Sequence, residues 1–168
     1  DHANIGLQRP FASMKEFDLF EKLYFDICRL GEFNQDFTLA EPHLRNADII
    51  NIDFNSIKAS ETLNPHANPN GFYAEQMCQI AKYAGISDKV TSFGIFNFEK
   101  PSDLCDKMLA ETIWYFLQGA MSRKGDFPIG SKIDYTRFTV FIEDSNREII
   151  FFKSTGTNSC NRIWYCHT

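Results

Sequence analysis

The residue whose position best suits chemistry is Asp53, which lies near the end of the apolar run 48–54. A carboxylate buried at the end of a strand costs free energy unless it meets a metal, a cation or several hydrogen-bond donors. Asn55 follows two residues later and shares a face with Asp53 if the strand continues. Because divalent cations accept carboxylate and amide oxygens, the pair is a candidate metal site. Spacing alone favours the other interpretation, in which Asp53 only accepts hydrogen bonds from loop amides.

A long polar loop, 56–72, follows Asp53 and carries His66 among asparagine, proline and glycine residues. The loop has no apolar period, so we expect no regular structure in it. Loops of this length in compact domains are usually functional, and this one leaves the carboxyl end of a strand, where open α/β sheets bind ligands. His66 is therefore a candidate substrate-binding residue, although it has no ligand-spaced partner. The other histidines are equally isolated: His2, His43 and His167.

The five cysteines give information about the compartment. No two of them have the spacing of a zinc ribbon or a thioredoxin-like motif, and an odd number cannot form a complete disulfide framework. Cys28, Cys78 and Cys105 lie in apolar surroundings and are expected to be buried free thiols. Cys160 and Cys166 lie in the polar tail. We therefore expect a reducing, cytoplasmic location.

Elements that would position Asp53 can be read from the apolar pattern. Dense apolar runs at 4–8, 24–29, 48–54 and 90–98 predict strands that are covered on both faces. Between them, helical stripes predict helices over 13–23, 41–47, 73–84 and 104–117, with Gly85 as a stop signal and Ser102 or Asp103 as a cap. Strands that alternate with helices predict an α/β fold with parallel pairing.

The end of the chain has a different pattern. The runs 138–143 and 148–153 flank a polar turn at 144–147 and predict an antiparallel hairpin. A linker is expected at 125–128. We therefore expect an α/β part over 1–126, and a hairpin with a C-terminal arm over 127–168 that packs on it or on a neighbouring subunit.

Composition excludes several classes of protein. The chain has 168 residues, with 22 acidic and 17 basic side chains and a net charge of −5. That balance leaves no basic stripe for phosphates, so no nucleic-acid partner is expected. No apolar run reaches about 18 residues, so no membrane span is expected either. The high aromatic content, 15%, excludes intrinsic disorder. Because the sequence begins at Asp1 and not at a methionine, we expect either a processed start or a missing part, and the strand order favours the back half of a larger domain.

Several motifs around Asp53 resemble one family. The segment Asn51-Ile-Asp-Phe-Asn55, the loop rich in Asn and Pro, a following helix and a strand that starts near Thr91 resemble the ureohydrolase superfamily of arginase, agmatinase and formimidoylglutamase. A late strand of that family carries the motif Ser-x-Asp-x-Asp-x-x-Asp-Pro. Segments 69–72, 78–88 and 113–116 are more similar to a formimidoylglutamase-like subgroup of Bacteroidetes type. The likeness covers the chain from residue 4 to about residue 164.

The resemblance implies a three-layer α/β/α fold with a mostly parallel sheet, of which this chain would be the C-terminal half. It also implies a two-manganese centre whose hydroxide attacks the carbon of a guanidino or formimidoyl substrate, which is metal-assisted hydrolysis. Members commonly form homo-oligomers. The histidine and the Asp-x-His-x-Asp strand that supply the family's earlier ligands have no match in this sequence. We therefore expect these 168 residues alone to be inactive.

Matching by position assigns roles to four residues. Asp53 falls on the first aspartate of the metal motif, Asn55 on the second and Lys58 on the third. Asn97 falls on the glutamate that typically holds the cationic group of the substrate. Amides do not neutralise dications as carboxylates do. Two functions stay open: hydrolysis of a linear amidine C–N bond by the complete protein, or a non-catalytic binding or structural role. An unrelated α/β binding domain is a third.

Overall fold

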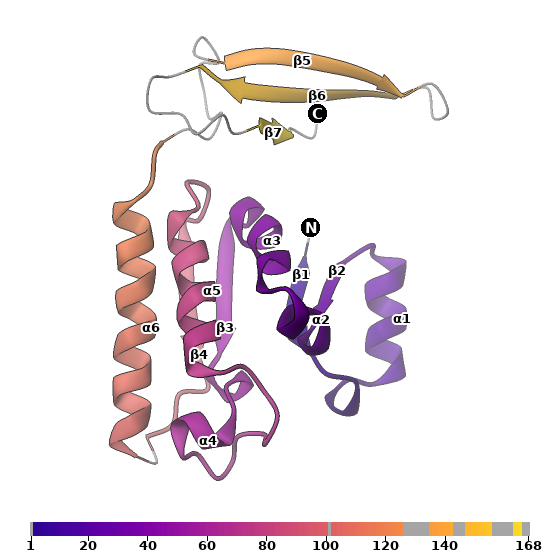
Figure 1. The fold of residues 1–168 in the computed structure, drawn as a ribbon. Coiled ribbons are helices and arrows are strands. Elements are labelled where there is room, and N and C mark those ends of the chain that lie inside the picture. The colour runs from indigo at the N-terminus through magenta and orange to yellow at the C-terminus, as the bar shows by residue number, and fades with distance from the viewer. Residues whose placement is uncertain (1, 101, 126–134, 143–146, 156–162, 166–168) are drawn as a thin grey trace. The chain divides into compact units, whose positions relative to one another are not determined.

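The computed structural model describes residues 2–100, 102–125, 135–142, 147–155 and 163–165. It divides into two compact units, Asp1–Arg123 and Lys124–Thr168 (Figure 1). The expected linker from residue 126 on, residues 143–146 of the expected hairpin, Cys160, Cys166 and His167 lie outside the described residues.

The first unit opens with a parallel strand pair. β1 (Ala3–Leu7) pairs with β2 (Asp26–Arg29), and the 3-10 turn η1 (Arg9–Phe11) and helix α1 (Met14–Lys22) connect them. Ser13 begins α1 with a capping box, in which its hydroxyl accepts from the backbone N–H of Glu16 and its own N–H donates to the Glu16 carboxylate. Both strands and the helix were predicted, and the parallel pairing is confirmed.

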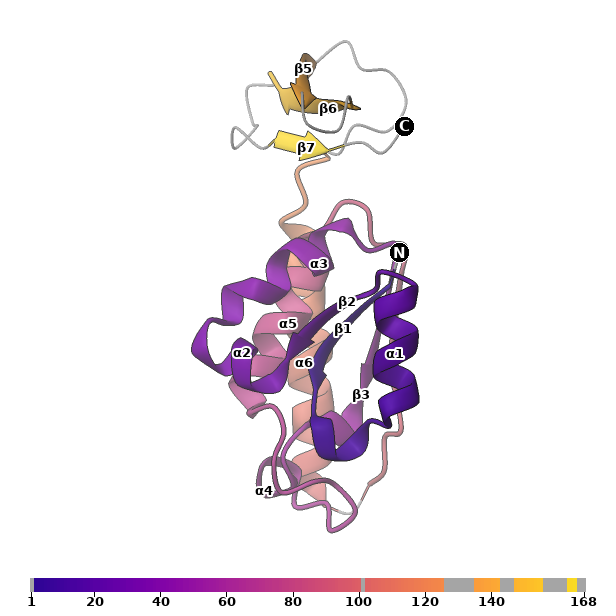
Figure 2. The same cartoon turned by 90° about the vertical axis from the view of Figure 1, so that its right-hand side faces the viewer.

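Three short helical elements follow, of which the sequence predicted only the last. They are α2 (Leu30–Gln35), the 3-10 turn η2 (Phe37–Ala40) and α3 (Glu41–Asn46). Leu30 and Phe33 of α2 are buried, and the Phe33 ring meets the Phe72 ring edge-on at 5.1 Å. In Figure 2, α1 and α2 lie on opposite sides of β1 and β2. This arrangement gives the layers helix, strand, helix.

A second parallel pair carries the candidate site. β3 (Ile49–Asp53) pairs with β4 (Ser92–Phe96) over five residues, with Asp53 opposite Phe96. Burial alternates along β3: Ile50 and Ile52 are buried, whereas Ile49 is 63% exposed. The prediction that both faces are covered is therefore wrong for β3, because helices cover one face.

Helices α5 (Ala74–Ile86) and α6 (Asp103–Met121) form that cover and pack against each other. The Phe93 ring of β4 stacks on the Phe116 ring of α6 at 4.1 Å. Ser102 is the N-cap of α6, as one of the two predicted candidates. The apolar core of the unit includes β2, α2, α3, β3 and α5.

Gly85 and Gly119 lie where the backbones of α5 and α6 approach each other closely. A Cβ atom on Gly85 would lie 2.1 Å from the carbonyl oxygen of Phe116, and one on Gly119 would lie 2.4 Å from that of Lys82. The prediction that Gly85 stops its helix is wrong, because α5 continues to Ile86. Both glycines are needed because a side chain there would collide with the other helix.

The loop 56–72 is more ordered than its sequence indicated. The 3-10 turn η3 (Phe54–Ser56) and the short helix α4 (Ala59–Thr62) occupy its start, and Ile57 bridges to Phe72. The Thr62 carbonyl accepts from the hydroxyl of Ser102 at 2.9 Å and the thiol of Cys105 at 3.0 Å. The expectation of no regular structure is therefore wrong in this part, and α4 is anchored to the start of α6.

The second unit is a three-stranded antiparallel sheet. β5 (Tyr135–Ile142) pairs with β6 (Arg147–Ser154), which also pairs with β7 (Ile163–Tyr165). The predicted hairpin is confirmed, whereas β7 was not predicted. Within the described residues of both units, no helix has the length and apolar character needed to span a membrane.

Candidate functional site

Asp53 and Asn97 meet at the carboxyl edge of β3 and β4. Asp53 is the last residue of β3, and Asn97 directly follows β4. Oδ1 of Asp53 accepts two hydrogen bonds, one from Nδ2 of Asn97 at 3.1 Å and one from the backbone N–H of Asn55 at 3.0 Å. Both side chains are exposed. The edge thus holds a carboxylate with one oxygen engaged by amides, as the simpler interpretation of Asp53 predicted.

The Asn97 backbone is in an unusual conformation that places the residue at this edge. Its φ is +56°, in the left-handed region that non-glycine residues seldom adopt. Asparagine tolerates this region better than most residues. The turn after β4 therefore depends on the residue that also donates to Asp53.

Asn55 does not share the face of Asp53, because the strand ends at Asp53 and η3 begins there. The Asp53 side chain caps this turn by accepting from the Asn55 N–H. The Asn55 side chain instead accepts from Nδ2 of Asn64 at 3.4 Å. The expectation that Asp53 and Asn55 share one strand face is therefore wrong, because β3 ends at Asp53.

Asn64 is a site residue that the sequence analysis did not single out. It is 3% exposed, and its Oδ1 accepts from the backbone N–H of His66 at 2.9 Å. An asparagine that binds the backbone two residues ahead forms an Asx turn, and the Asn-Pro pair at 64–65 was the available signal. His66 itself is exposed. The structure thus joins the loop to Asn55 through Asn64, and only the backbone of His66 takes part.

Lys58 does not bring a positive charge to Asp53. Its ammonium nitrogen lies 3.6 Å from the ring centroid of Tyr73, a cation–π contact. Its backbone N–H donates to the carbonyl of Phe72 at 3.0 Å. Lys58 therefore interacts with the residues that lead into α5.

The residues at this edge do not fit the two-manganese centre that the family resemblance implies. Two neighbouring dications need several anionic ligands to offset their mutual repulsion. Among the residues that the structure describes, no cluster of three or more His, Cys, Asp or Glu side chains could hold a metal ion. Asp53 accepts instead from the backbone N–H of Asn55 and the side-chain amide of Asn97, so its surroundings suit hydrogen bonding to an organic ligand.

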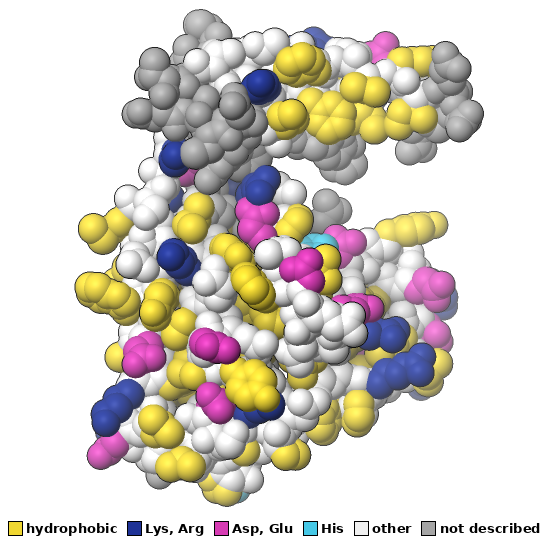
Figure 3. All heavy atoms as spheres, viewed as in Figure 1, with side chains coloured by type: hydrophobic (Ala, Val, Ile, Leu, Met, Phe, Trp, Pro, Cys, Tyr) yellow, Lys and Arg dark blue, Asp and Glu magenta, His cyan; other side chains and the backbone are white. Residues whose placement is uncertain are grey.

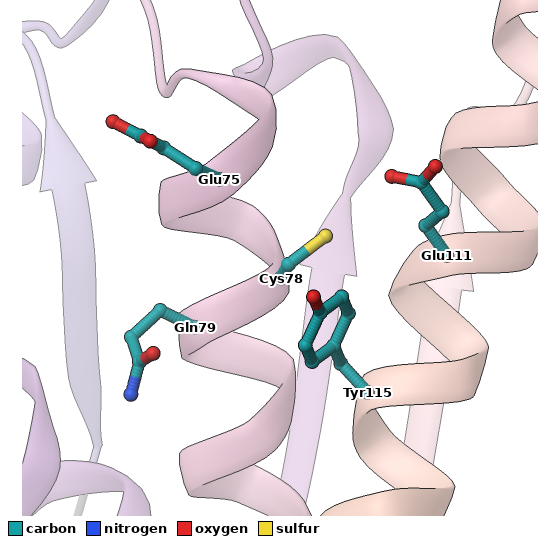
Figure 4. A pocket seen from close by; sticks show the side chains of 5 residues that line it. All are labelled: Glu75, Cys78, Gln79, Glu111 and Tyr115. Carbon is teal, nitrogen blue, oxygen red and sulfur yellow. The ribbon is translucent and has the colours of Figure 1, made fainter.

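A second group of polar side chains lies between α5 and α6, where a hollow of about 340 Å³ opens (Figure 4). Glu75, Cys78 and Gln79 line it from α5, and Glu111 and Tyr115 from α6. Burial of the Cys78 thiol, together with the negative charge of Glu111, raises the pKa of Cys78 to about 11. A thiol with a raised pKa is a poor nucleophile because it is rarely ionised. The hollow therefore lacks an activated nucleophile.

Comparisons with known proteins identify the fold. No protein-family model and no curated protein sequence matches the chain. Solved structures do. A formiminoglutamase from Trypanosoma cruzi with Mn²⁺ superposes with a TM-score of 0.66 at 13% identity, over 73% of this chain and 45% of that one. Formimidoylglutamase from Bacillus subtilis superposes with a TM-score of 0.62 at 15% identity, over 72% of this chain and 42% of that one. An arginase superfamily protein from T. cruzi superposes with a TM-score of 0.63 at 14% identity, over 73% of this chain and 44% of that one.

These matches confirm the predicted arginase-like α/β fold over about three quarters of the chain. The chain spans less than half the length of the structures that it matches. At these identities the likeness concerns the fold, and the role of Asp53 depends on its own surroundings.

Proposed function

We propose that the protein is a ureohydrolase-fold protein that binds a small guanidino or formimidoyl compound at the carboxyl edge of β3 and β4. The observation that carries this proposal is the meeting of the Asp53 carboxylate with the Asn97 amide at that edge. Oδ1 of Asp53 accepts two donors, whereas Oδ2 accepts none from the described residues. An exposed carboxylate oxygen of this kind attracts the planar N–H groups of an amidinium or guanidinium cation.

The fold supports the same location. Open α/β sheets bind ligands beyond the carboxyl ends of their strands, and Asp53 and Asn97 lie at those ends. Asn97 uses its amide nitrogen on Asp53. Its amide carbonyl is then an acceptor for a second N–H group of the same ligand. Hydrogen bonds to neutral amides orient a cation, while Asp53 supplies the charge.

Hydrolysis of a linear amidine C–N bond by the complete protein is the finer form of the proposal, with a formimidoyl amino acid as the preferred substrate. Its support is that formiminoglutamases are among the similar structures, one of them with Mn²⁺. Asp53 alone of the candidate residues is a carboxylate. Hydrolysis with manganese therefore requires anionic metal ligands in addition to Asp53.

A non-catalytic relative on the same fold is the second candidate, and one specific observation favours it. By the family resemblance, Asn55 falls on an aspartate of the metal motif and Asn97 on a separate glutamate, and both amides engage in hydrogen bonds within the site. A site of this composition binds an organic cation without metal. The cytoplasmic location belongs to the same set of proposals, supported by the free thiols of Cys28, Cys78 and Cys105.

Calorimetric titration of the full-length protein with formimidoylglutamate, agmatine and arginine tests the binding proposal. We expect one of these compounds to bind through its cationic amidinium or guanidinium group without metal, and Asp53→Asn to weaken its affinity about tenfold or more, because a charge-assisted hydrogen bond is lost. Asp48→Asn is the matched control, since Asp48 is an exposed acid just before the other end of β3 and pairs with Lys89. Equal affinity of wild type and Asp53→Asn, or no binding by wild type, refutes the proposal.

Release of formamide or urea separates the two candidates. The same protein is incubated with each compound in the presence and absence of Mn²⁺. Product that appears with Mn²⁺ and disappears in Asp53→Asn supports the enzyme. Binding without any product supports the non-catalytic relative.

A further inference from the structure

The outer edge of β5 is open among the described strands. The sheet order is β5-β6-β7, so β5 pairs with β6 on one side only. In a strand of eight residues, about every second residue directs its N–H and C=O away from the paired neighbour. Proteins usually protect such edges with proline, lysine, bulges or very short strands. β5 has no proline or lysine and carries one charged residue, Arg137.

One face of this sheet is apolar and exposed. Directly opposite residues of an antiparallel pair share a face, and the register places Phe138 opposite Phe151 and Val140 opposite Ile149. Phe138 is 46% exposed, Val140 47% and Ile142, two residues further along the same face, 37%. Hydrophobic side chains gather along this hairpin in Figure 3. An exposed apolar row beside an open edge favours association with another strand.

We propose that β5 pairs antiparallel with β5 of a second copy of this chain, around a two-fold axis at Thr139. The two-fold axis places each residue of β5 opposite the residue of the second copy that lies equally far on the other side of Thr139. Every contact between the two strands is therefore made twice. On the apolar face, Phe138 lies opposite Val140 of the second copy, and Val140 opposite its Phe138. The two sheets become one six-stranded sheet, and the exposed apolar rows join across the axis.

Charge complementarity selects this register. On the other face, Arg137 lies opposite Phe141 of the second copy, whose own neighbour on β6 is Glu148. Arg137, Phe141 and Glu148 are all exposed, and Arg137 and Glu148 make no ion pair within the described part of the chain. The guanidinium can therefore cover the Phe141 ring and reach the Glu148 carboxylate. The like charges of the two Arg137 residues stay apart, because Thr139 lies between them.

Sedimentation equilibrium of the full-length protein measures this association. We expect a dimer whose dissociation constant rises at least tenfold in Val140→Lys, which places a charge on the apolar face, and in Arg137→Glu. Glu148→Arg should weaken the dimer in the same way, and the double variant Arg137→Glu with Glu148→Arg should recover most of the affinity. A protein that is monomeric at all concentrations overturns the proposal, whether its own chain covers the edge or leaves it open. A dimer unchanged by Val140→Lys and Arg137→Glu also overturns it.

Crosslinking keeps the register testable if a charge variant fails to fold. Thr139→Cys, in a background with Cys160→Ser and Cys166→Ser, places two thiols about 5 Å apart across the axis. A short bismaleimide should then link the two copies. Thr136→Cys is the control, because the two residues at 136 lie roughly 20 Å apart in this register. Crosslinks at both positions, or at position 136 alone, contradict the proposed pairing.

Discussion

The core of the first unit buries its apolar side chains, whereas the sheet of the second unit leaves several of its own exposed. In the first, Phe33 is 1% exposed and Met77 is 2% exposed, between helices and parallel strands. In the second, Phe141 of β5 is 54% exposed and Val140 is 47% exposed, on a sheet without a helix among the described residues. Both regions contain apolar strands, but among the described residues helices cover only those of the first unit.

The apolar runs of the chain therefore serve two purposes. Where a helix layer covers a strand, the run stabilises the fold. Where the described residues place no layer on a strand, its apolar side chains stay exposed, as the proposed pairing of β5 requires. Substitutions of the same chemical kind should therefore have large effects on stability in the first unit and small ones in the second.

Truncation of a core phenylalanine should have the largest effect. Phe33→Ala removes a ring that is 1% exposed and meets the Phe72 ring at 5.1 Å. We expect the free energy of unfolding to fall by about 3–5 kcal/mol, measured by urea denaturation. Phe141→Ala, at dilutions where the chain is monomeric, should change it by less than about 0.5 kcal/mol. Similar losses for both would abolish the contrast between the two regions.

A methyl group between α5 and α6 should have the next largest effect. Gly85→Ala would place its Cβ 2.1 Å from the Phe116 carbonyl oxygen, so we expect a loss of about 2–3 kcal/mol in the free energy of unfolding, because the helices must separate. Gly31→Ala is the control. Gly31 lies in α2 with no atom within 4 Å of an added Cβ. Gly31→Ala should raise the free energy of unfolding by about 0.5–1 kcal/mol, because alanine has the higher helix propensity. A stabilising Gly85→Ala contradicts the close approach.

Thiol reactivity should distinguish the same regions kinetically. The raised pKa of Cys78, about 11, reduces its thiolate at pH 8 roughly a hundredfold relative to an ordinary cysteine. Maleimide labelling of Cys78 should therefore be at least that much slower than labelling of a cysteine placed on β5 by Thr136→Cys. Glu111→Gln should lower the pKa of Cys78 while leaving it raised, because burial is the larger cause. Equal labelling rates for the two thiols would contradict the burial of Cys78.

The pH dependence of stability follows from the same thiol. The folded chain holds the Cys78 proton up to about pH 11, whereas the unfolded chain loses it near the ordinary pKa of 9.0. The stabilising contribution is therefore complete below pH 9 and is lost as the pH rises toward 11. Comparison of wild type with Cys78→Ala by urea denaturation across this range isolates the effect.

The smallest effect should come from the exposed edge of β3 and β4. Asn97 has a φ of +56°, which glycine adopts without strain. Asn97→Gly should therefore be more stable than Asn97→Ala by about 1 kcal/mol. Neither variant should approach the loss expected for Phe33→Ala. If Asn97→Ala is the more stable of the two in thermal unfolding, the left-handed conformation is not what constrains this residue.

Much of the fold could be predicted because the elements that carry it have a clear apolar period. The four predicted strands and four predicted helices of the first unit all correspond to observed elements. Helix α2 was missed because its six residues contain two buried side chains, Leu30 and Phe33, beside Gly31 and Asn34. A helix this short depends on tertiary packing, which local sequence does not reveal.

The site was predicted in part for a similar reason. The sequence identified Asp53 as the end of a strand, and the family resemblance identified Asn97. The sequence pattern did not predict the turn at Asp53, because that turn forms when the Asp53 carboxylate caps the next residues. Asn64 was missed because its role depends on burial beside Asn55, nine residues away.

The contact of Gly85 with Gly119 has an evolutionary consequence. A residue larger than glycine at either position would push the backbones of α5 and α6 apart. The facing residue cannot compensate by becoming smaller, since it is already glycine. A substitution at either position alone should therefore be selected against. Homologous chains that keep this helix packing should carry glycine at both positions, even where the residues around Asp53 have diverged.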